Sequence, residues 1–232
     1  VIGDGPARHF EAQLADYVRA GFRDFKIKLS GNVERDLDKV RLISSSGVDA
    51  ERVRADANNL WRDADEAMRA LKALDFPFCA LEEPLQAGDY AGLQRVALEL
   101  DTRIILDESL LRSSQLGDAA GFAERCIVNL RISKMGGLIR SLRLAREISE
   151  RGLGLIVGAH VGETSVLTRA ALTVAHAARD RLVAQEGAFG THLLERDVTD
   201  PPIMFGAGGI LDVSAAPFAA RPGLGLDIKR SP

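Results

Sequence analysis

Lysine is scarce in this chain of 232 residues, in which six lysines stand against 24 arginines. Three of the six fall in two short motifs, Lys26-Ile27-Lys28 and Ser133-Lys134-Met135-Gly136-Gly137. Arginine supplies a solubilising charge almost anywhere, but its guanidinium stays protonated at any workable pH, whereas an amine can be tuned into a base. The use of lysine at these positions therefore indicates proton transfer.

Other scarcities exclude whole classes of protein. The formal charge of −3 gives no excess of basic residues, so the composition does not indicate a protein that binds nucleic acid or a membrane surface. There is no signal-peptide pattern and no apolar run of membrane-spanning length, so we expect a cytoplasmic protein. The two cysteines, Cys79 and Cys126, lie in separate apolar runs, and we expect buried, reduced thiols.

Short apolar runs recur along the chain, each followed by polar residues and a helix-period stretch. Such nearly continuous apolar runs are typical of parallel strands buried on both faces. The predicted strands are Phe25–Leu29, Val53–Asp56, Phe78–Glu82, Ile104–Asp107, Ile127–Ile132, Leu153–Val157 and Leu182–Gln185. The intervening helices include one capped by Asp63 and two others within residues 138–148 and 166–177.

The polar residue at each strand end recurs at an even interval. Steps of 28, 26, 25, 27, 26 and 26 residues separate Lys28, Asp56, Glu82, Asp107, Lys134, His160 and Glu186. One βα unit needs about that many residues. The spacing therefore predicts an α/β fold, a (β/α)8 barrel of the TIM type with its active site at the carboxyl ends of the strands. A doubly wound open sheet is the alternative.

The two ends of the chain are less regular. Val1-Ile2-Gly3 reads as the tail of a truncated first strand, and we expect residues 1–200 to form the barrel. Residues 201–232 are rich in glycine and proline. We expect them to form a C-terminal extension that packs on the barrel or on a capping domain.

Three acidic residues end consecutive predicted strands. Alternation along the strand points Glu82 into the barrel and Glu83 outward, towards the helices. Asp56, Glu82 and Asp107 then converge from adjacent strands. Three carboxylates in one place repel each other unless a cation lies among them, and an all-oxygen set favours Mg²⁺ over zinc.

The three motif lysines bracket this carboxylate cluster. Lys26 and Lys28 precede it and share one side of their strand, while Lys134 follows it. Lys28 and Lys134 would address opposite faces of a bound substrate. An amine that is partly desolvated beside another cation loses affinity for its proton, as a general base must. Removal of the proton α to a carboxylate gives an enediolate, whose added charge the metal and the lysines would stabilise.

The ordered motifs K-x-K, D-A-N, L-E-E-P, L-D-E-S and S-K-M-G-G resemble those of the enolase superfamily, and within it the muconate-lactonizing-enzyme (muconate cycloisomerase) subgroup. The resemblance spans roughly residues 20–190. It implies an enolase C-terminal-domain-like barrel in which Asp56, Glu82 and Asp107 bind Mg²⁺, with Mn²⁺ as a substitute.

The same resemblance assigns the remaining site residues. It implies that Lys28 is an acid/base, that Lys134 is its partner from the opposite face, and that Lys26 assists Lys28. Three further residues would hold the metal ligands in place: Asn58, Glu83 and Glu108.

The chain also departs from its relatives at several points. The mandelate-racemase branch uses a histidine after the seventh strand as its base, paired with an aspartate on the sixth. His160 follows the seventh strand, but Lys134 ends the sixth, so His160 is a candidate substrate contact. Glu186 is a second candidate, because dipeptide epimerases carry Asp-x-Asp where this chain has Glu186-Gly187-Ala188. We expect the family's amino-terminal capping domain to lie outside the sequence given.

These observations predict a Mg²⁺-dependent isomerase that acts on a small-molecule carboxylate by racemisation, epimerisation or cycloisomerisation. Syn-dehydration of the o-succinylbenzoate-synthase kind, which would make the protein a lyase, is one alternative. A barrel that has lost catalysis and persists as a binding protein is another. We expect a homo-oligomer.

Overall fold

The computed structural model describes residues 1–214 and 221–229, so two short parts of the predicted C-terminal extension lie outside the described residues. The chain divides into two compact units, Val1–Ile127 and Val128–Pro232. Strands and helices alternate along most of both units, as the even spacing of the motifs predicts.

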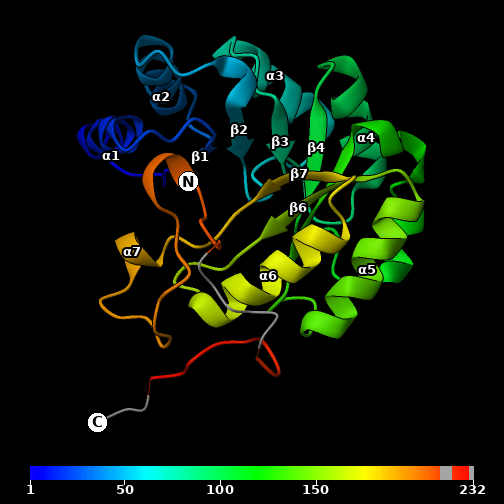
Figure 1. The fold of residues 1–232 in the computed structure, drawn as a ribbon. Helices are drawn as coiled ribbons and strands as arrows, with labels where there is room; N and C mark the ends of the chain where they lie inside the picture. Colours follow the sequence, from blue (N-terminus) through cyan, green and yellow to red (C-terminus); the bar gives the residue numbers. More distant parts are fainter. Residues whose placement is uncertain (215–220, 230–232) are drawn as a thin grey trace. The chain divides into compact units, whose positions relative to one another are not determined.

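The first unit contains a parallel sheet. Its strands are β1 (Phe25–Lys28), β2 (Val53–Asp56), β3 (Ala80–Glu82) and β4 (Arg103–Leu106). The helices that alternate with them pack side by side in chain order (Figure 1): α1 (Ala7–Arg19), α2 (Val33–Ser45), α3 (Ala64–Leu74) and α4 (Tyr90–Glu99). Three short 3-10 helices complete the unit: η1 (Ala50–Arg52), η2 (Ser113–Gly117) and η3 (Ala120–Arg125).

The apolar runs fold as predicted because both faces of the strands are covered. Ile27, Val53, Leu81 and Ile105 are at most 3% exposed. Ile2 extends the sheet beyond β1, since its N–H donates to the carbonyl of Lys26 and its carbonyl accepts from the N–H of Lys28. Ile2 thus forms a parallel bridge beside β1, and its assignment to a truncated first strand stays a prediction.

Helix α3 begins where its sequence signal places it. The side chain of Asp63 accepts a hydrogen bond from the N–H of Glu66 at 2.9 Å, which satisfies one of the unpaired donors of the first turn. Ala67, Leu71 and Leu74 lie on the buried face of the helix. The predicted cap and the predicted apolar stripe are both confirmed.

The second unit contains β6 (Gly154–Gly158) and β7 (Leu182–Gln185), which pair in parallel. Helices α5 (Leu138–Glu150) and α6 (Ser165–Ala177) pack against each other and against β6 (Figure 1). Strand β5 (Cys126–Arg131) spans the boundary between the units. Two short helices follow β7, namely α7 (Gly190–Leu193) and η4 (Ala207–Gly209).

The turn between β5 and α5 depends on two glycines. Gly136 and Gly137 have φ angles of 83° and 99°, in the left-handed region that a side chain disfavours. This turn carries Lys134, and Gly137 ends it by capping the start of α5. The Gly-Gly pair of the S-K-M-G-G motif therefore reverses the chain directly after the lysine.

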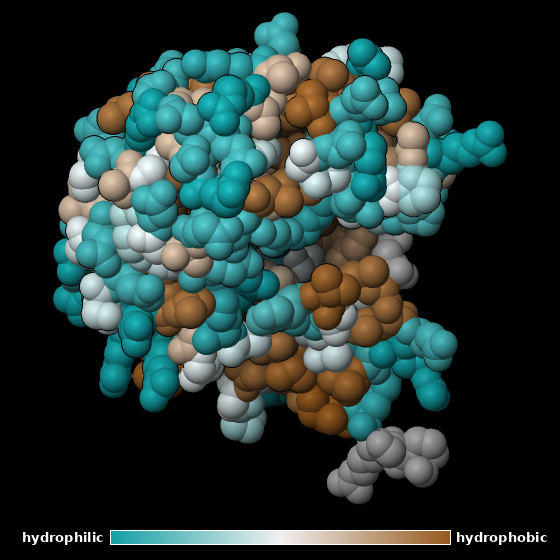
Figure 2. All heavy atoms as spheres, turned by 180° about the vertical axis from the view of Figure 1, so that it is seen from behind, coloured by the Kyte–Doolittle hydropathy of each residue, from teal (hydrophilic) through white to brown (hydrophobic). Residues whose placement is uncertain are grey.

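The surface carries mixed side chains. On the face drawn in Figure 2, hydrophilic residues predominate and hydrophobic residues form smaller groups. Within the described ranges, none of the helices combines the length and the hydropathy needed to cross a membrane.

Candidate active site

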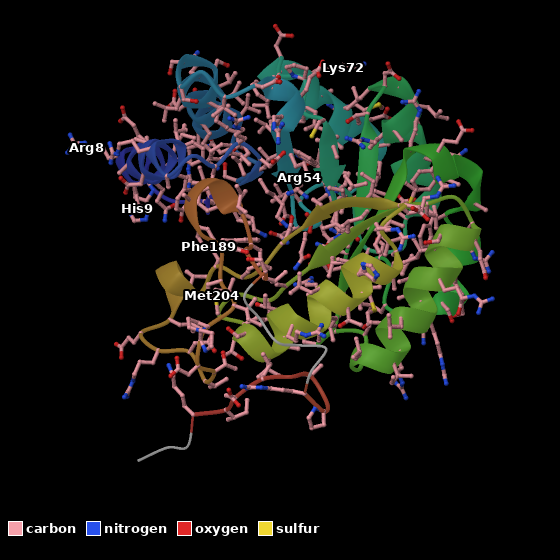
Figure 3. The ribbon with its side chains drawn as sticks, viewed as in Figure 1. Arg8, His9, Arg54, Lys72, Phe189 and Met204 are labelled. Carbon is pink, nitrogen blue, oxygen red and sulfur yellow. The ribbon has the colours of Figure 1, made fainter. Side chains whose placement is uncertain are left out.

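The first unit presents the predicted lysines and carboxylates in register on neighbouring strands. Lys28 on β1 lies opposite Asp56 on β2, and Asp56 lies opposite Glu82 on β3. Lys26 lies opposite Arg54, which is labelled in Figure 3. Because successive side chains alternate between the two faces of a strand, all five project from the same side of the sheet.

The ammonium groups of the two lysines lie against the carboxylates. Lys26 Nζ is 2.9 Å from Glu82 Oε2 and 4.0 Å from Asp56 Oδ2. Lys28 Nζ is 2.6 Å from Asp56 Oδ2 and also donates to Asn58 Oδ1. The Lys26 side chain is only 7% exposed, whereas that of Lys28 is 31% exposed. Of the two amines, Lys28 is therefore the one that a substrate can reach.

Glu83 fixes the loop that carries Asp107. Glu83 Oε1 accepts the N–H groups of Asp107 at 2.6 Å and of Ser109 at 2.7 Å, and Oε2 accepts the Ser109 hydroxyl at 2.7 Å. The expectation that Glu83 faces outward, towards the helices, stays a prediction, whereas its hydrogen-bond partners are new. Strand β3 ends at Glu82, so alternation stops there, and a left-handed φ of 40° at Glu83 turns its carboxylate to the next loop.

The environment of Glu83 has opposing effects on its charge. Complete burial raises the pKa of its carboxyl group, and the nearby charge of Glu108 adds to this rise. The hydrogen bonds from Ser109 and Asp107 act in the other direction, because they stabilise the ionised form. Glu83 is therefore a buried carboxyl group that accepts three hydrogen bonds from the Asp107 loop and one, at 3.3 Å, from Asn59 Nδ2 after β2.

The donor set at this end of the sheet suits a hard divalent cation. Asp56, Glu82 and Asp107 are at most 4% exposed and offer only oxygen atoms. The buried Oε2 of Glu108 has no hydrogen-bond partner among the described residues. A buried carboxylate oxygen without a partner destabilises the folded state unless a cation lies beside it. In their present positions, however, no three acidic, histidine or cysteine side chains of the described chain form a group that could hold a metal ion. Two lysine ammonium groups face the carboxylates instead, so the three-residue ligand set stays a prediction.

A buried ion pair lies directly behind Lys28. Lys39 Nζ on α2 donates to Asp36 Oδ1, to Asp4 Oδ1 and to the backbone carbonyl of Lys28, each at 2.8 Å. Asp36 also accepts hydrogen bonds from three donors of the loop after β1, namely Ser30 N, Ser30 Oγ and Gly31 N. Asp36 and Lys39 are 2% and 3% exposed. The sequence analysis did not predict this pair. Charged residues at positions 36 and 39, on the helix face that also carries Val40 and Ile43, could have indicated a buried ion pair.

The second unit carries the other predicted residues. Lys134 lies in the turn after β5, where its Nζ is 3.4 Å from the carbonyl of Asn129. Glu186 directly follows β7, and its N–H donates to the carbonyl of Val157 on β6 at 2.8 Å. His160 follows β6 and is half exposed.

His160 belongs to a cluster that sequence analysis did not identify. Ser133 Oγ lies 2.7 Å from His160 Nδ1 and 3.0 Å from Glu163 Oε1. Glu163 Oε1 also accepts the backbone N–H of His160 at 2.8 Å. Both additional residues stand next to predicted ones in the sequence, but nothing in their spacing indicates that they meet.

Comparison with known proteins places these features in a family. Residues 9–231 match the family model described as Enolase C-terminal domain-like. The chain is 30% identical over 230 residues to the L-Lys-D/L-Arg epimerase of Methylococcus capsulatus, covering 97% of this chain and 61% of that protein. It is 31% identical over 221 residues to the o-succinylbenzoate synthase of Geobacillus stearothermophilus, covering 92% of this chain and 54% of that protein.

Solved structures show the same fold. A dipeptide epimerase from Methylococcus capsulatus, solved in complex with a Mg ion, has a TM-score of 0.79 at 28% identity and covers 98% of this chain and 64% of its own. Muconate lactonizing enzyme from Pseudomonas putida has a TM-score of 0.78 at 26% identity, with 98% and 62% covered. The chain thus spans a little over half the length of the relatives it matches, and the expected α/β barrel class is confirmed. The chain belongs to the enolase C-terminal domain-like family.

Proposed function

We propose that the protein removes the proton α to the carboxylate of a small substrate in a Mg²⁺-dependent reaction, and that it acts as a racemase or epimerase. The observation that carries this proposal is the contact of the accessible Lys28 Nζ with Asp56 Oδ2 at 2.6 Å, beside two further buried carboxylates. An amine next to an oxygen-rich cation site is the arrangement that enediolate chemistry needs. Relatives named as epimerases and racemases support the same reaction class.

Asp56, Glu82 and Asp107 are the residues that would hold Mg²⁺, or Mn²⁺ in its place. The cation supplies positive charge that stabilises an enediolate relative to the parent carboxylate. Lys26 holds the Glu82 carboxylate through its 2.9 Å contact, and Glu83 orients the backbone on which Asp107 lies. These contacts preorganise the ligands before substrate arrives.

Lys28 would take the α-proton at Nζ. For this step the amine must be neutral and must leave Asp56, and the 31% exposure of its side chain gives it room to move. The electron pair of the broken C–H bond passes into the substrate carboxylate, which gives the enediolate. By the family resemblance, the Lys134 ammonium returns a proton to the opposite face, so that the configuration at the α-carbon is inverted.

Syn-dehydration is the second candidate reaction, and the o-succinylbenzoate synthase relative at 31% identity favours it. Lys28 would then remove the α-proton and return it to the departing hydroxyl group, which leaves as water. The product would have lost the α-hydrogen and the β-hydroxyl group and would contain a double bond between the α- and β-carbons. Cycloisomerisation would pass through the same kind of enediolate, formed when a substrate carboxylate oxygen adds to a carbon–carbon double bond and then protonated at the α-carbon by a lysine; the muconate lactonizing enzyme fold supports it.

Proton NMR in D₂O tests the proposal and separates these reactions. The complete gene product is incubated with dipeptides, N-acyl amino acids and muconate-like acids, with and without Mg²⁺. Mg²⁺-dependent loss of the α-proton signal, without change in the carbon skeleton, is the expected result. New vinyl signals would identify dehydration instead. No change with any class, despite Mg²⁺ binding, would contradict catalysis and favour a barrel that serves only as a binding protein.

A further inference from the structure

The backbone of Lys28 is held from more than one side. Its N–H donates to the carbonyl of Ile2 at 3.0 Å, and the N–H of Leu29 donates to the carbonyl of Asp56 at 2.9 Å. The carbonyl of Lys28 accepts a hydrogen bond from Lys39 Nζ on α2 at 2.8 Å. One of the groups that fix this strand end is therefore a side-chain charge from a helix.

The Lys39 ammonium is itself held by carboxylates. Its Nζ donates to Asp36 Oδ1 and to Asp4 Oδ1, each at 2.8 Å. Asp36 in turn accepts the N–H groups of Ser30 and Gly31, at 3.0 and 3.1 Å. The ion pair of Asp36 and Lys39 thus contacts the backbone at three points, all at or directly after the proposed base.

Stability alone does not account for a buried ion pair at this place. The side chains of Asp36 and Lys39 are each 3% exposed, on the helix face that also carries Val40 and Ile43. Apolar side chains of similar volume are often equally stabilising or more so, because no charge has to be desolvated. Apolar side chains could not, however, supply a donor to the Lys28 carbonyl or an acceptor to the loop that follows it.

We propose that Lys39, held by Asp36, is a positioning residue for Lys28: it fixes the backbone from which the Lys28 amine reaches Asp56. The contact is with the Lys28 carbonyl, and the Lys28 side chain remains 31% exposed. A reacting group misplaced by about 1 Å can lose about a hundredfold in rate, so the backbone beneath a base must be fixed closely. The inference rests on the proposed function, in which Lys28 removes the α-proton.

Three variants separate positioning from stability. Lys39→Met removes the donor to the Lys28 carbonyl and leaves Asp36 without its cation. Asp36→Asn/Lys39→Met removes the same donor without an unpaired charge, and it carries the test if the single variant fails to fold. Leu93→Ala is the control, because Leu93 is fully buried on α4 and its truncation destabilises the fold through a cavity.

The position of the Lys28 amine can be measured without a substrate. The complete gene product is treated with a low dose of N-hydroxysuccinimidyl acetate, and peptide mass spectrometry gives acetylation at Lys28 relative to Lys72, which is exposed on α3. We expect this ratio to rise about threefold in both Lys39 variants, as loss of a partly exposed ion pair allows. It should keep its wild-type value in Leu93→Ala. An unchanged ratio in the Lys39 variants, or an equal rise in Leu93→Ala, would overturn the inference.

The kinetics of α-deuterium incorporation supply the second measurement, on a substrate that exchanges in the wild type. We expect both Lys39 variants to lower kcat about tenfold to a hundredfold, with KM and the Kd for Mg²⁺ nearly unchanged, because the base alone is displaced. Leu93→Ala should retain the wild-type kcat per folded molecule. A decrease in kcat no larger than that in Leu93→Ala would overturn the inference.

The two proposals fail in distinguishable ways. A raised acetylation ratio in the Lys39 variants, without exchange of any substrate by the wild type, would contradict the proposed reaction and leave the placement of Lys28 by Lys39 standing. Exchange by the wild type, with both readouts unaltered in the Lys39 variants, would do the reverse.

Discussion

Replacement of Lys39 by methionine should lower the free energy of unfolding by about 3–5 kcal/mol, the usual result of removing one partner from a buried ion pair. Asp36 would stay 2% exposed without its cation. The hydrogen-bond donors of Ser30 and Gly31 would still stabilise the Asp36 carboxylate. The decrease in the free energy of unfolding should therefore fall near the lower end of this range, about 3 kcal/mol. Methionine replaces most of the apolar stem of Lys39, so a cavity adds little.

The same helix supplies a matched control. Arg41 and Asp38 form an ion pair on α2 at 3.1 Å, but their side chains are 72% and 57% exposed. Arg41→Met should therefore change the free energy of unfolding by less than about 1 kcal/mol. In the double variant Asp36→Asn/Lys39→Met no charge is left unpaired, so it should be more stable than Lys39→Met alone.

Urea unfolding measures all of these variants, with the fluorescence of the buried Trp61 reporting on the first unit. The comparison requires equal m-values, so that a lower midpoint reflects stability alone. Equal losses in Lys39→Met and Arg41→Met would refute the reasoning, because burial would then have no bearing on the pair. A double variant less stable than Lys39→Met would refute it as well.

Three further predictions follow from the described contacts. Glu83→Gln should weaken Mg²⁺ binding about tenfold or more, since the Asp107 loop loses a carboxylate acceptor, and an unchanged Kd in titration calorimetry would contradict this role. Iodoacetamide should modify the half-buried Cys79 before Cys126, because burial raises the pKa of the Cys126 thiol to about 12; peptide mass spectrometry showing equal rates would argue against it. Burial also raises the pKa of Tyr90 to about 12. The unfolded chain loses both protons first, so the free energy of unfolding should fall as pH rises from about 9 towards about 12, and urea midpoints that do not decline would contradict it.

Much of the fold could be predicted because its strands have a simple signature. Val53–Asp56 and Leu182–Gln185 are β2 and β7 to the residue. Burial explains the apolar run of β2, whereas β7 is only partly buried and Val183 is 42% exposed. The Asp63 cap is a local interaction between neighbours in the chain. Short strands and helix caps, which depend on four or five neighbouring residues, can therefore be predicted from the sequence.

The hydrogen-bond partners of Glu83 could not be predicted because they depend on the backbone beyond the strand. Alternation applies only while the chain stays extended, and it ends at Glu82. The left-handed φ of Glu83 carries its side chain to Ser109, 26 residues away. The identity of Glu83 as a supporting group came from the family resemblance, whereas the donors it binds came from the structure.

The supporting charges were missed for a different reason. Asp36 and Lys39 share the buried face of α2 with Val40 and Ile43, where periodicity predicts apolar residues. Charged residues at such positions need buried partners, and one of those partners is the backbone carbonyl of Lys28 on another element. The cluster of Ser133 with Glu163 spans 30 residues and has no sequence signature at all.

The central claim is that Lys28 removes the α-proton, and a comparison of two lysine variants tests it most directly. Once an exchanging substrate is known, α-deuterium incorporation is measured in Lys28→Ala and in Lys72→Ala, whose lysine is exposed on α3 (Figure 3). Loss of a general base should slow exchange in Lys28→Ala by about a hundredfold to ten-thousandfold, with Mg²⁺ affinity nearly unchanged, while Lys72→Ala exchanges at the wild-type rate. Exchange by Lys28→Ala close to the wild-type rate would contradict the assignment.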